Sequence, residues 1–429
     1  MIKKGQRQSG QPVIQETTEL QRQAVPGPSA DAPAAAKKLE EKEDQKGARG
    51  EAPNLLAGLA NLDTVEEEQD QQIAKLKKFK DQITVEGNVR VHVTMQGPRE
   101  VLCTKYNEEF DYIAGGYSDG VVRVYKSNTG EHIFTLSDKE VDNVGAPCTS
   151  IKHRQISKLY PITNCYTATY ANGCVKCWSY HFNQCLYTIR EKRQTYGLAY
   201  HPRFPKFVTY GDDLKIHLYD EETRTQERIL TSSNYPDKHD GHTSRVFAGV
   251  FHPKNNYELI TGGWDDTIQF WDLRQPYAVR HIAGCHLCGE GLDIHPRGNE
   301  ILVASFQLTD ALQLFDYGSG RRIARLEPDI YPSKLYCGKF INKDFVICGG
   351  AEPHIVRIID LQSTTNAGLI TSISGGVYSC DIGPARKKYE KDKKEYFAED
   401  VQIRMKTDLT VLPRVVFLSS KKMYQLEFF

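Results

Sequence analysis

The chain has 429 residues, and its 55 Lys and Arg residues balance its 55 Asp and Glu residues, so the formal net charge is zero. This balance argues against a protein that works mainly by general attraction to nucleic acid or to an anionic membrane. A composition with 33 Gly, 23 Tyr and 17 Phe, beside 3 Trp and 4 Met, favours strands and tight turns over helix bundles.

Targeting and redox signals indicate an intracellular protein, cytoplasmic or nuclear. No apolar run approaches the length of a membrane span, and the amino terminus lacks the apolar core of a signal peptide. The 11 cysteines are therefore expected to be reduced and mostly buried, as small hydrophobic residues rather than a disulfide framework.

The amino-terminal segment differs in composition from the rest of the chain. Residues 1–62 are rich in Gln, Ala, Pro, Glu and Lys, and they cannot bury enough apolar area to offset the entropy lost on ordering, so we expect a disordered arm. Over 63–82, three glutamates precede Ile73, Leu76 and Phe79 at helical spacing. A short docking helix and a solvated linker both fit this segment.

From Thr84 onward the apolar residues recur with a period of two. Val89, Val91 and Val93 alternate with polar residues, which predicts a strand over 88–95. This strand has no partner nearby in the sequence.

Seven units of similar pattern follow. Each contains short runs rich in β-branched and aromatic residues, separated by turns with Gly, Asp or His-Pro. The last unit contains an insertion at about 385–412. The first strands are expected to begin near Val101, Cys148, Tyr196, Val246, Leu292, Leu335 and Val377.

The most complete unit runs from Gly241 to Asp272. Its spacing allows His242, Thr261, Asp265 and Trp271 to meet in one hydrogen-bonded chain, in which indole and imidazole donors face hydroxyl and carboxylate acceptors. A catalytic His-Asp pair with Thr261 as nucleophile is the alternative. We reject it because the spacing recurs in other units without the nucleophile.

This unit resembles a WD-repeat blade, which has Gly-His before the first strand and Trp-Asp at the end of the third. The resemblance covers about residues 85–429 and implies an all-β fold, a single seven-bladed β-propeller spanning 83–429. It also implies that His242, Thr261, Asp265 and Trp271 are a structural tetrad. Units five and six depart from the pattern, since Thr309 and Pro353 stand where an Asp is expected.

The two ends of the chain are expected to close the ring. The last unit ends with strands at Val415–Leu418 and Met423–Phe429 and lacks an outermost strand. We expect residues 88–95 to supply it, because pairing the two ends removes both free sheet edges.

Two cysteine motifs are interpreted as structural. Cys174 and Cys177 lie three apart on a predicted strand, so their sulfurs point to opposite faces and cannot share a tetrahedral ion. Cys285 and Cys288 would need two further ligands, and the nearest histidines fall on different strands. We expect no metal and no cofactor.

Partner contacts are expected on one face of the propeller. In proteins that resemble this one, partners meet the loops between blades and the turn before each third strand. Trp264, in a tight turn, is the first candidate for a binding hot spot. The candidates on this face are Trp264, Tyr117, Tyr235, His239 and Tyr331.

The insertion carries a basic cluster interrupted by acidic residues. A solvated loop is the simplest interpretation, and a docking site for an acidic partner or a nuclear import signal are alternatives. The basic residues are Arg386, Lys387, Lys388, Lys391, Lys393 and Lys394.

The sequence favours a non-enzymatic scaffold that joins proteins in an assembly, by analogy with the family that it resembles. A histone or chromatin-binding propeller is one alternative and would require an acidic face or channel mouth. A propeller enzyme is a second alternative. It would require acidic residues, histidines or metal ligands that converge from the innermost strands, and we expect no such group of residues there. We expect protein partners, no small-molecule substrate, no direct nucleic-acid binding and no membrane insertion; a cytoskeletal or ciliary assembly fits but no residue requires it.

Overall fold

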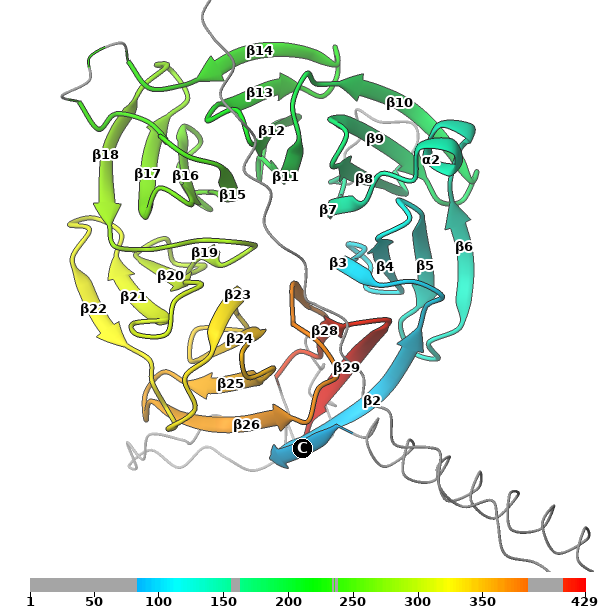
Figure 1. Ribbon diagram of the computed structural model, residues 1–429, viewed down its shortest axis with the longest axis vertical. Coiled ribbons are helices and arrows are strands. Elements are labelled where there is room, and N and C mark those ends of the chain that lie inside the picture. The colour runs from blue at the N-terminus through cyan, green and yellow to red at the C-terminus, as the bar shows by residue number, and fades with distance from the viewer. Residues whose placement is uncertain (1–82, 156–162, 234, 236–237, 385–411) are drawn as a thin grey trace, which may run out of the picture. The chain divides into compact units, whose positions relative to one another are not determined.

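The described part of the chain is a β-propeller with seven sheets arranged radially around a central channel (Figure 1). This confirms the predicted fold class. The expected arm at 1–62, the segment 63–82 and nearly all of the insertion lie outside the described residues. The computed structural model describes residues 83–155, 163–233, 235, 238–384 and 412–429.

Each blade is an antiparallel meander whose first strand borders the channel, with later strands farther out (Figure 1). Blade one contains β3 (Val101–Tyr106), β4 (Tyr112–Tyr117), β5 (Val122–Lys126) and β6 (His132–Leu136); blade two contains β7 (Cys148–His153), β8 (Cys165–Tyr170), β9 (Cys174–Ser179) and β10 (Gln184–Arg190). Blade three contains β11 (Thr195–Tyr200), β12 (Lys206–Gly211), β13 (Ile216–Asp220) and β14 (Thr225–Leu230).

The remaining blades follow the same order, and a short helix, α2 (Lys139–Val144), lies between blades one and two. Blade four contains β15 (Val246–Phe251), β16 (Glu258–Gly263), β17 (Thr267–Asp272) and β18 (Ala278–Ala283); blade five contains β19 (Leu292–Ile294), β20 (Glu300–Ala304), β21 (Leu312–Asp316) and β22 (Arg322–Arg325). Blade six contains β23 (Lys334–Phe340), β24 (Phe345–Ala351), β25 (Val356–Asp360) and β26 (Thr365–Thr371); blade seven contains β27 (Cys380–Ile382), β28 (Val415–Ser419) and β29 (Lys422–Phe428).

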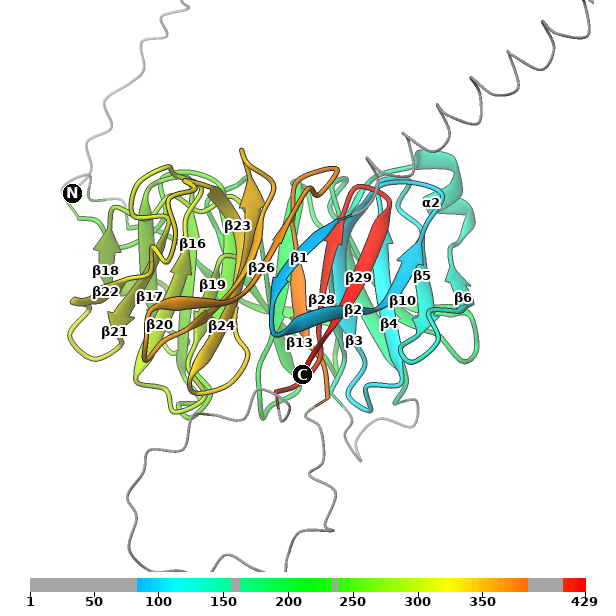
Figure 2. The same ribbon diagram turned by 90° about the horizontal axis from the view of Figure 1, so that it is seen from below.

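The antiparallel order gives the ring two distinct faces. The upper face carries the connections between blades and the turns from second to third strands; α2 lies on it, at the top of Figure 2. The lower face carries the turns that follow the first strands. Three of those turns contain His-Pro, and the Nδ1 atoms of His201, His252 and His295 each accept a backbone N–H two residues on. His201 and His252 also bond carbonyls of the next blade, which ties neighbouring blades together.

Two amino-terminal strands close the ring, β1 (Thr84–Gly87) and β2 (Val89–Gln96). β2 pairs with β29, so that Val91 lies opposite Leu426, as the alternating valines predicted. β1 pairs with β26 as a fifth strand of blade six, which the sequence analysis missed (Figure 2). The two strands are separated at Gly87, where φ is +90°. A Cβ atom at this position would lie 2.4 Å from the backbone oxygen of Ala367, so only glycine fits.

The core lies between adjacent blades rather than inside any one of them. Trp271 of blade four packs in one cluster with Leu218 of blade three, and Trp178 of blade two packs with Val124 of blade one. Each sheet therefore depends on its neighbours for burial, and closing the ring covers the faces that would otherwise be exposed.

Candidate functional site

The four tetrad residues predicted in blade four form one buried hydrogen-bonded chain. Trp271 Nε1 donates to Thr261 Oγ1 at 2.7 Å, and Thr261 Oγ1 lies 2.7 Å from His242 Nε2. His242 Nδ1 lies 2.7 Å from Asp265 Oδ2. Because Asp265 accepts from Nδ1–H, a neutral His242 accepts the Thr261 hydroxyl at Nε2, and every member is satisfied.

The charge state of Asp265 follows from this geometry. Burial raises its pKa, but hydrogen bonds from His242 and from the backbone N–H of Thr243 outweigh burial, so the pKa of Asp265 lies below its ordinary value. The side chains of His242 and Asp265 are 0% and 2% exposed. A site closed to solvent in this way serves to hold the Asp265 turn in place.

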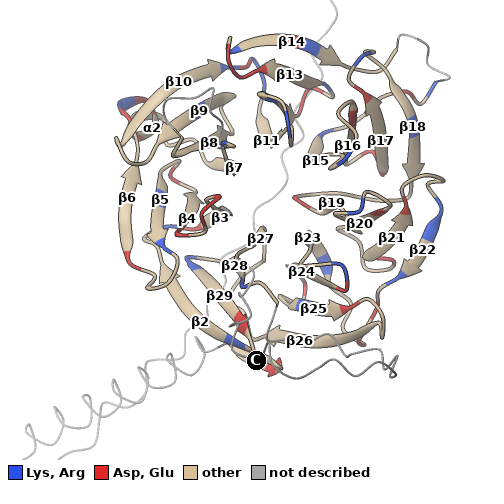
Figure 3. Ribbon diagram, turned by 180° about the vertical axis from the view of Figure 1, so that it is seen from behind, with Lys and Arg blue, Asp and Glu red and all other residues tan. Residues whose placement is uncertain are grey.

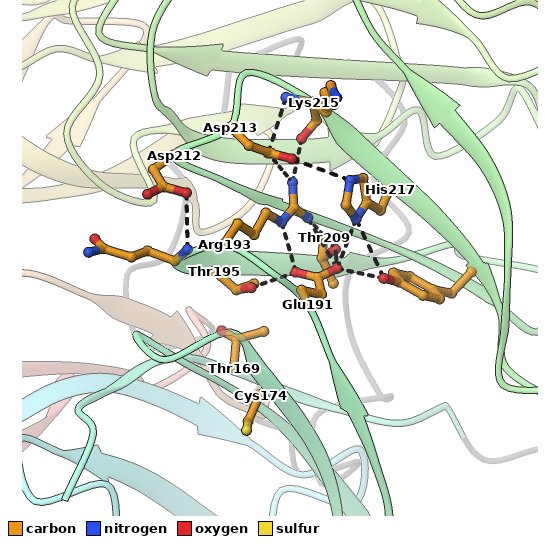
Figure 4. A network of polar contacts seen from close by, with 12 residues as sticks. Thr169, Cys174, Glu191, Arg193, Thr195, Thr209, Asp212, Asp213, Lys215 and His217 are labelled. Atoms are coloured by element: carbon orange, nitrogen blue, oxygen red, sulfur yellow. Dashed lines mark hydrogen bonds and ion pairs between the residues drawn. The ribbon is translucent and has the colours of Figure 1, made fainter. Parts of the chain in front are cut away.

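Blade three replaces the tetrad with a different polar network (Figure 4). Glu191 accepts from Arg193 Nε at 2.8 Å, from Tyr219 Oη at 2.7 Å and from Thr209 Oγ1 at 2.5 Å. Arg193 then reaches Asp213, with a donor-to-acceptor distance of 2.6 Å. Glu191 and Arg193 were not predicted, because no Gly-His precedes this unit.

Trp264 lies on the upper face and is 41% exposed, as expected for a surface residue. Its Nε1 donates to the Sγ of Cys288 at 2.9 Å, and its ring lies 5.4 Å from that of Phe247 and 6.0 Å from that of His286. The guanidinium of Arg245 lies 5.1 Å from its ring centroid. One face and one edge of the indole are thus held, and the rest is open to solvent.

Trp264 is part of a larger set of partly exposed rings that spans blades three to seven. Tyr196 stacks on Phe247 at 4.7 Å, and farther along the ring Tyr336 lies 4.7 Å from Phe306 and 5.0 Å from Tyr378. We call this set the aromatic arc. Its members are Tyr196, Phe247, Trp264, His286, Phe306, Tyr336 and Tyr378.

The arc depends on β-bulges at the start of the first strands. The pairing register skips Tyr196 in β11, Phe247 in β15 and Tyr336 in β23, so each is the extra residue of a bulge. A bulge re-aims the side chain that it carries. The sequence analysis missed these residues; the signal that could have found them is an aromatic residue at the second or third position of three first strands.

The other upper-face candidates are exposed but separate from the arc. Tyr235 is 66% exposed and lies beneath Lys238 Nζ at 5.0 Å, and Tyr331 is 50% exposed. His239 is exposed and lies 5.7 Å from the ring of His281. Within the described residues, no ring contact joins Tyr235, His239 or Tyr331 to Trp264.

Tyr117 was wrongly predicted to be a surface residue. It is 0% exposed, and its hydroxyl lies 2.6 Å from that of Tyr125. Because Ile113 pairs with Tyr125 as Leu259 pairs with Trp271, the position equivalent to Trp264 is Ser118, one residue later. A shift of one residue along a strand turns the side chain to the opposite side.

The cysteine motifs have separate surroundings. Cys174 Sγ lies 3.6 Å from Glu140, whereas Cys177 contacts Cys165, so the two sulfurs diverge as predicted. In the second motif Cys285 is buried, and Cys288 accepts from Trp264. In the described ranges no group of three or more His, Cys, Asp or Glu residues could hold a metal ion. The predicted basic loop lies outside the described residues.

The channel corrects another expectation, because charged residues do converge there. Lys105 pairs with Asp381 at 2.7 Å, Lys339 lies 3.2 Å from Asp381 and 3.8 Å from Glu290, and Lys152 pairs with Glu290 at 2.5 Å. Figure 3, which views the lower face, shows both signs of charge on the blades around the channel. The sequence analysis missed this set because its members come from five different blades.

Comparisons with known proteins agree with the fold. The family described as WD domain, G-beta repeat, matches residues 235–272. The chain is 26% identical over 196 residues to the Ribosome biogenesis protein WDR12 homolog of Anopheles gambiae, covering 44% of each chain. It is 30% identical over 112 residues to the Probable coatomer subunit beta' of Schizosaccharomyces pombe, covering 25% of this chain and 13% of that protein.

A third relative is the Target of rapamycin complex subunit wat1 of Schizosaccharomyces pombe, 28% identical over 124 residues, which covers 29% of this chain and 36% of that protein. The chain thus spans less than half the length of these relatives. The fold and the tetrad define the class of protein as a repeat-built β-propeller. The chain is similar to WD-repeat proteins, and the matching family model covers one of its seven blades. In the described part of the chain, no helix has the length and apolar character of a membrane span.

Proposed function

We propose that this protein is a non-enzymatic scaffold that holds protein partners on its upper face within a multiprotein assembly. The observation that carries the proposal is the aromatic arc, because partly exposed Trp and Tyr residues are enriched at the energetic centres of protein interfaces. Trp264 lies within the arc and is 41% exposed.

The arc is held rigidly, which favours binding. Trp264 is fixed by its hydrogen bond to Cys288 and by Arg245 over its ring, and Phe247 is fixed by stacking on Tyr196. A surface that is already ordered loses little conformational entropy when a partner binds. The arc therefore offers apolar contact area at low entropic cost.

The relatives support a role in assemblies. Their names describe a ribosome biogenesis protein, a coatomer subunit and a subunit of the target of rapamycin complex. By analogy we place this protein inside the cell as a subunit of a complex. The basic loop at 386–394 remains a candidate for a second docking site.

The channel carboxylates give an enzymatic role little support. Burial raises the pKa of Glu290, but the ammonium groups of Lys152 and Lys339 outweigh burial and bring it to about 2. The pKa of Asp381 is likewise lowered by Lys105 and Lys339 against the effect of burial. Carboxylates held ionised in ion pairs are poor general acids at neutral pH.

The test is affinity purification of the full-length protein from its native cell with Trp264→Ala and Phe247→Ala combined. We expect partners to be lost while the unfolding temperature stays that of the wild type. The matched control is Tyr257→Ala, since Tyr257 is 46% exposed and stacks with Arg274 in the same blade, in the turn after β15 on the lower face. Undiminished capture by the double variant, or equal loss in the control, would contradict the proposal.

A further inference from the structure

A groove of about 290 Å³ lies on the upper face, where blade five meets blade six. Its walls come from the turn between β20 and β21, at 308–312, and from the connection between β22 and β23, at 326–333. The buried side chains of Leu312, Leu335 and Cys348 also line it. No member of the aromatic arc does, so the groove is a different surface from the one proposed to hold partners.

The edge of the groove exposes large apolar side chains. Ile330 is 88% exposed, Leu308 is 54% exposed and Tyr331 is 50% exposed. Among the described residues, Ile330 is the most exposed large apolar side chain. Exposed apolar residues that gather at one place on a surface mark a contact site, whereas single ones are common.

The connection that carries Ile330 is fixed to the outer strands of blade six. Asp329 accepts from Nε and Nη2 of Arg357 in β25, at 2.7 and 2.8 Å, and from Nδ2 of Asn366 in β26, at 2.7 Å. Arg357 also donates to the carbonyl of Tyr331. The apolar edge is therefore already ordered, and covering it costs little conformational entropy.

The chain enters the ring close to this groove. Glu86 of β1 pairs with Leu369 of β26, which in turn pairs with Arg357 in the groove lining. Neighbouring strands are about 4.8 Å apart, so β1 lies roughly 10 Å across the sheet from Arg357. Thr84 is at the upper end of β1, where its hydroxyl donates to Ser372 Oγ at 3.2 Å. The residues that precede β1 are thus delivered to the upper face beside the groove.

Segment 71–82, which lies outside the described residues, has a sequence that fits this groove. Ile73, Leu76 and Phe79 recur every three residues, as expected for one side of a helix. Phe79 is five residues before Thr84 and Leu76 is eight residues before it. An extended chain spans at most about 3.4 Å per residue, so these side chains can reach roughly 17 and 27 Å from Thr84.

The charge of the groove lining is opposite to that of the segment. The charged residues in the lining are Glu327, Asp329 and Arg357, and the last two compensate each other. Glu327 is exposed and accepts the backbone N–H of Asp310 at 3.2 Å, and within the described residues it takes part in no ion pair. Segment 71–82 contains four lysines and one aspartate, so it carries a net positive charge.

We propose that segment 71–82 docks in this groove, with Ile73, Leu76 and Phe79 packed against the apolar edge. A helix of about ten residues is marginal in water by itself, so its order would come from covering its apolar side. Attachment to β1 keeps the segment at a high effective concentration near the groove. Of the two interpretations of 63–82, the proposal selects the docking helix over the solvated linker, and it does not depend on the proposed function.

The first experiment measures hydrogen exchange of the backbone amides of 73–80 in the full-length protein. We expect exchange at least about tenfold slower than in a free peptide of the same sequence, because the free peptide is too short to hold a helix. In the double variant Leu308→Ser with Ile330→Ser this protection is expected to be lost. Both side chains are exposed, so the ring itself should keep its fold.

Two matched variants separate the groove from general surface effects. Val279→Ser also removes an exposed apolar side chain, 60% exposed and on the outer strand β18 of blade four, and is expected to keep the protection. Leu76→Ser, within the segment, is expected to lose it as the double variant does. The unfolding temperature is a poor measure here, since a weak local contact changes it little in a domain of this size.

The second experiment identifies what occupies the groove. A photoreactive benzophenone side chain at position 79 of the full-length protein is expected to cross-link to 308–312 or 326–333. The reaction is run on a mixture of 15N-labelled and unlabelled chains, and we expect each cross-linked pair of peptides to come from one chain.

Four results would overturn the proposal. They are exchange at 73–80 as fast as in the free peptide, protection that survives in the Leu308→Ser and Ile330→Ser double variant, and protection lost equally in Val279→Ser. The fourth is cross-linking outside the groove or between labelled and unlabelled chains, since the occupant would then be another surface or a second copy.

Discussion

Replacing Thr261 with Val tests the buried chain of blade four with little change in side-chain volume. The hydroxyl of Thr261 accepts from Trp271 Nε1 and lies against His242 Nε2, both at 2.7 Å. In Thr261→Val both partners stay buried without a hydrogen bond. Each buried group left unpaired costs about 1–3 kcal/mol, so with two such groups we expect the free energy of unfolding to fall by about 2–6 kcal/mol.

Guanidinium denaturation measures this loss as a lower denaturant concentration at the unfolding midpoint, with an unchanged dependence of the unfolding free energy on denaturant concentration. Trp271→Phe removes the indole N–H, so the double variant Thr261→Val with Trp271→Phe is expected to lose less than the sum of the single variants. Thr225→Val, on the outer strand β14, is the control and is expected to stay within about 0.5 kcal/mol of wild type. A loss in Thr261→Val no larger than in this control, or strictly additive losses in the double variant, would refute the account of the tetrad.

Two further predictions concern ring closure and pH. A chain that starts at residue 83 is expected to keep the wild-type unfolding temperature. A chain that starts at residue 97 lacks β1 and β2, so the edges of β26 and β29 are exposed and we expect it to aggregate. Equal solubility of the two chains, measured by light scattering, would count against ring closure by these strands. Burial lowers the pKa of His217, but its bonds to Asp213 and Glu191, beside Arg193 and Tyr219, outweigh burial and raise it. The stability from charged His217 is therefore fully present below its unfolded pKa of about 6.5 and is lost as pH rises through the higher folded pKa. The difference in stability between wild type and His217→Gln should shrink as the pH rises above about 6.5, and a difference that does not change with pH would contradict this.

The strands, the repeat and the closing pair could be predicted because their signals are local. Alternation of apolar and polar residues sets the side that each side chain takes, and the turns at Gly, Asp and His-Pro set where strands end. The tetrad of His242, Thr261, Asp265 and Trp271 lies within one unit, so its spacing alone brought it together. The pairing of Val91 with Leu426 followed from a strand without a partner at one end and a blade without an outer strand at the other.

Where the prediction failed, a shift of one residue or an added strand was responsible. Tyr117 was placed on the surface, whereas the position equivalent to Trp264 is Ser118, and a step of one position moves a side chain from one side of the sheet to the other. β1 was missed because its four residues pair with β26, about 280 residues away in the chain. The end of β1 at Gly87, where φ is positive, was also not recognised as the boundary between β1 and β2.

The aromatic arc and the channel were decided only by tertiary structure. Bulges in β11, β15 and β23 turn aromatic residues outward, and a bulge appears in the pairing register rather than in composition. Lys152 meets Glu290, 138 residues later, only because the closed ring places blades two and five across one channel. Periodicity specifies which way a side chain points within its own strand, whereas the neighbours that it meets depend on how the blades are arranged around the axis.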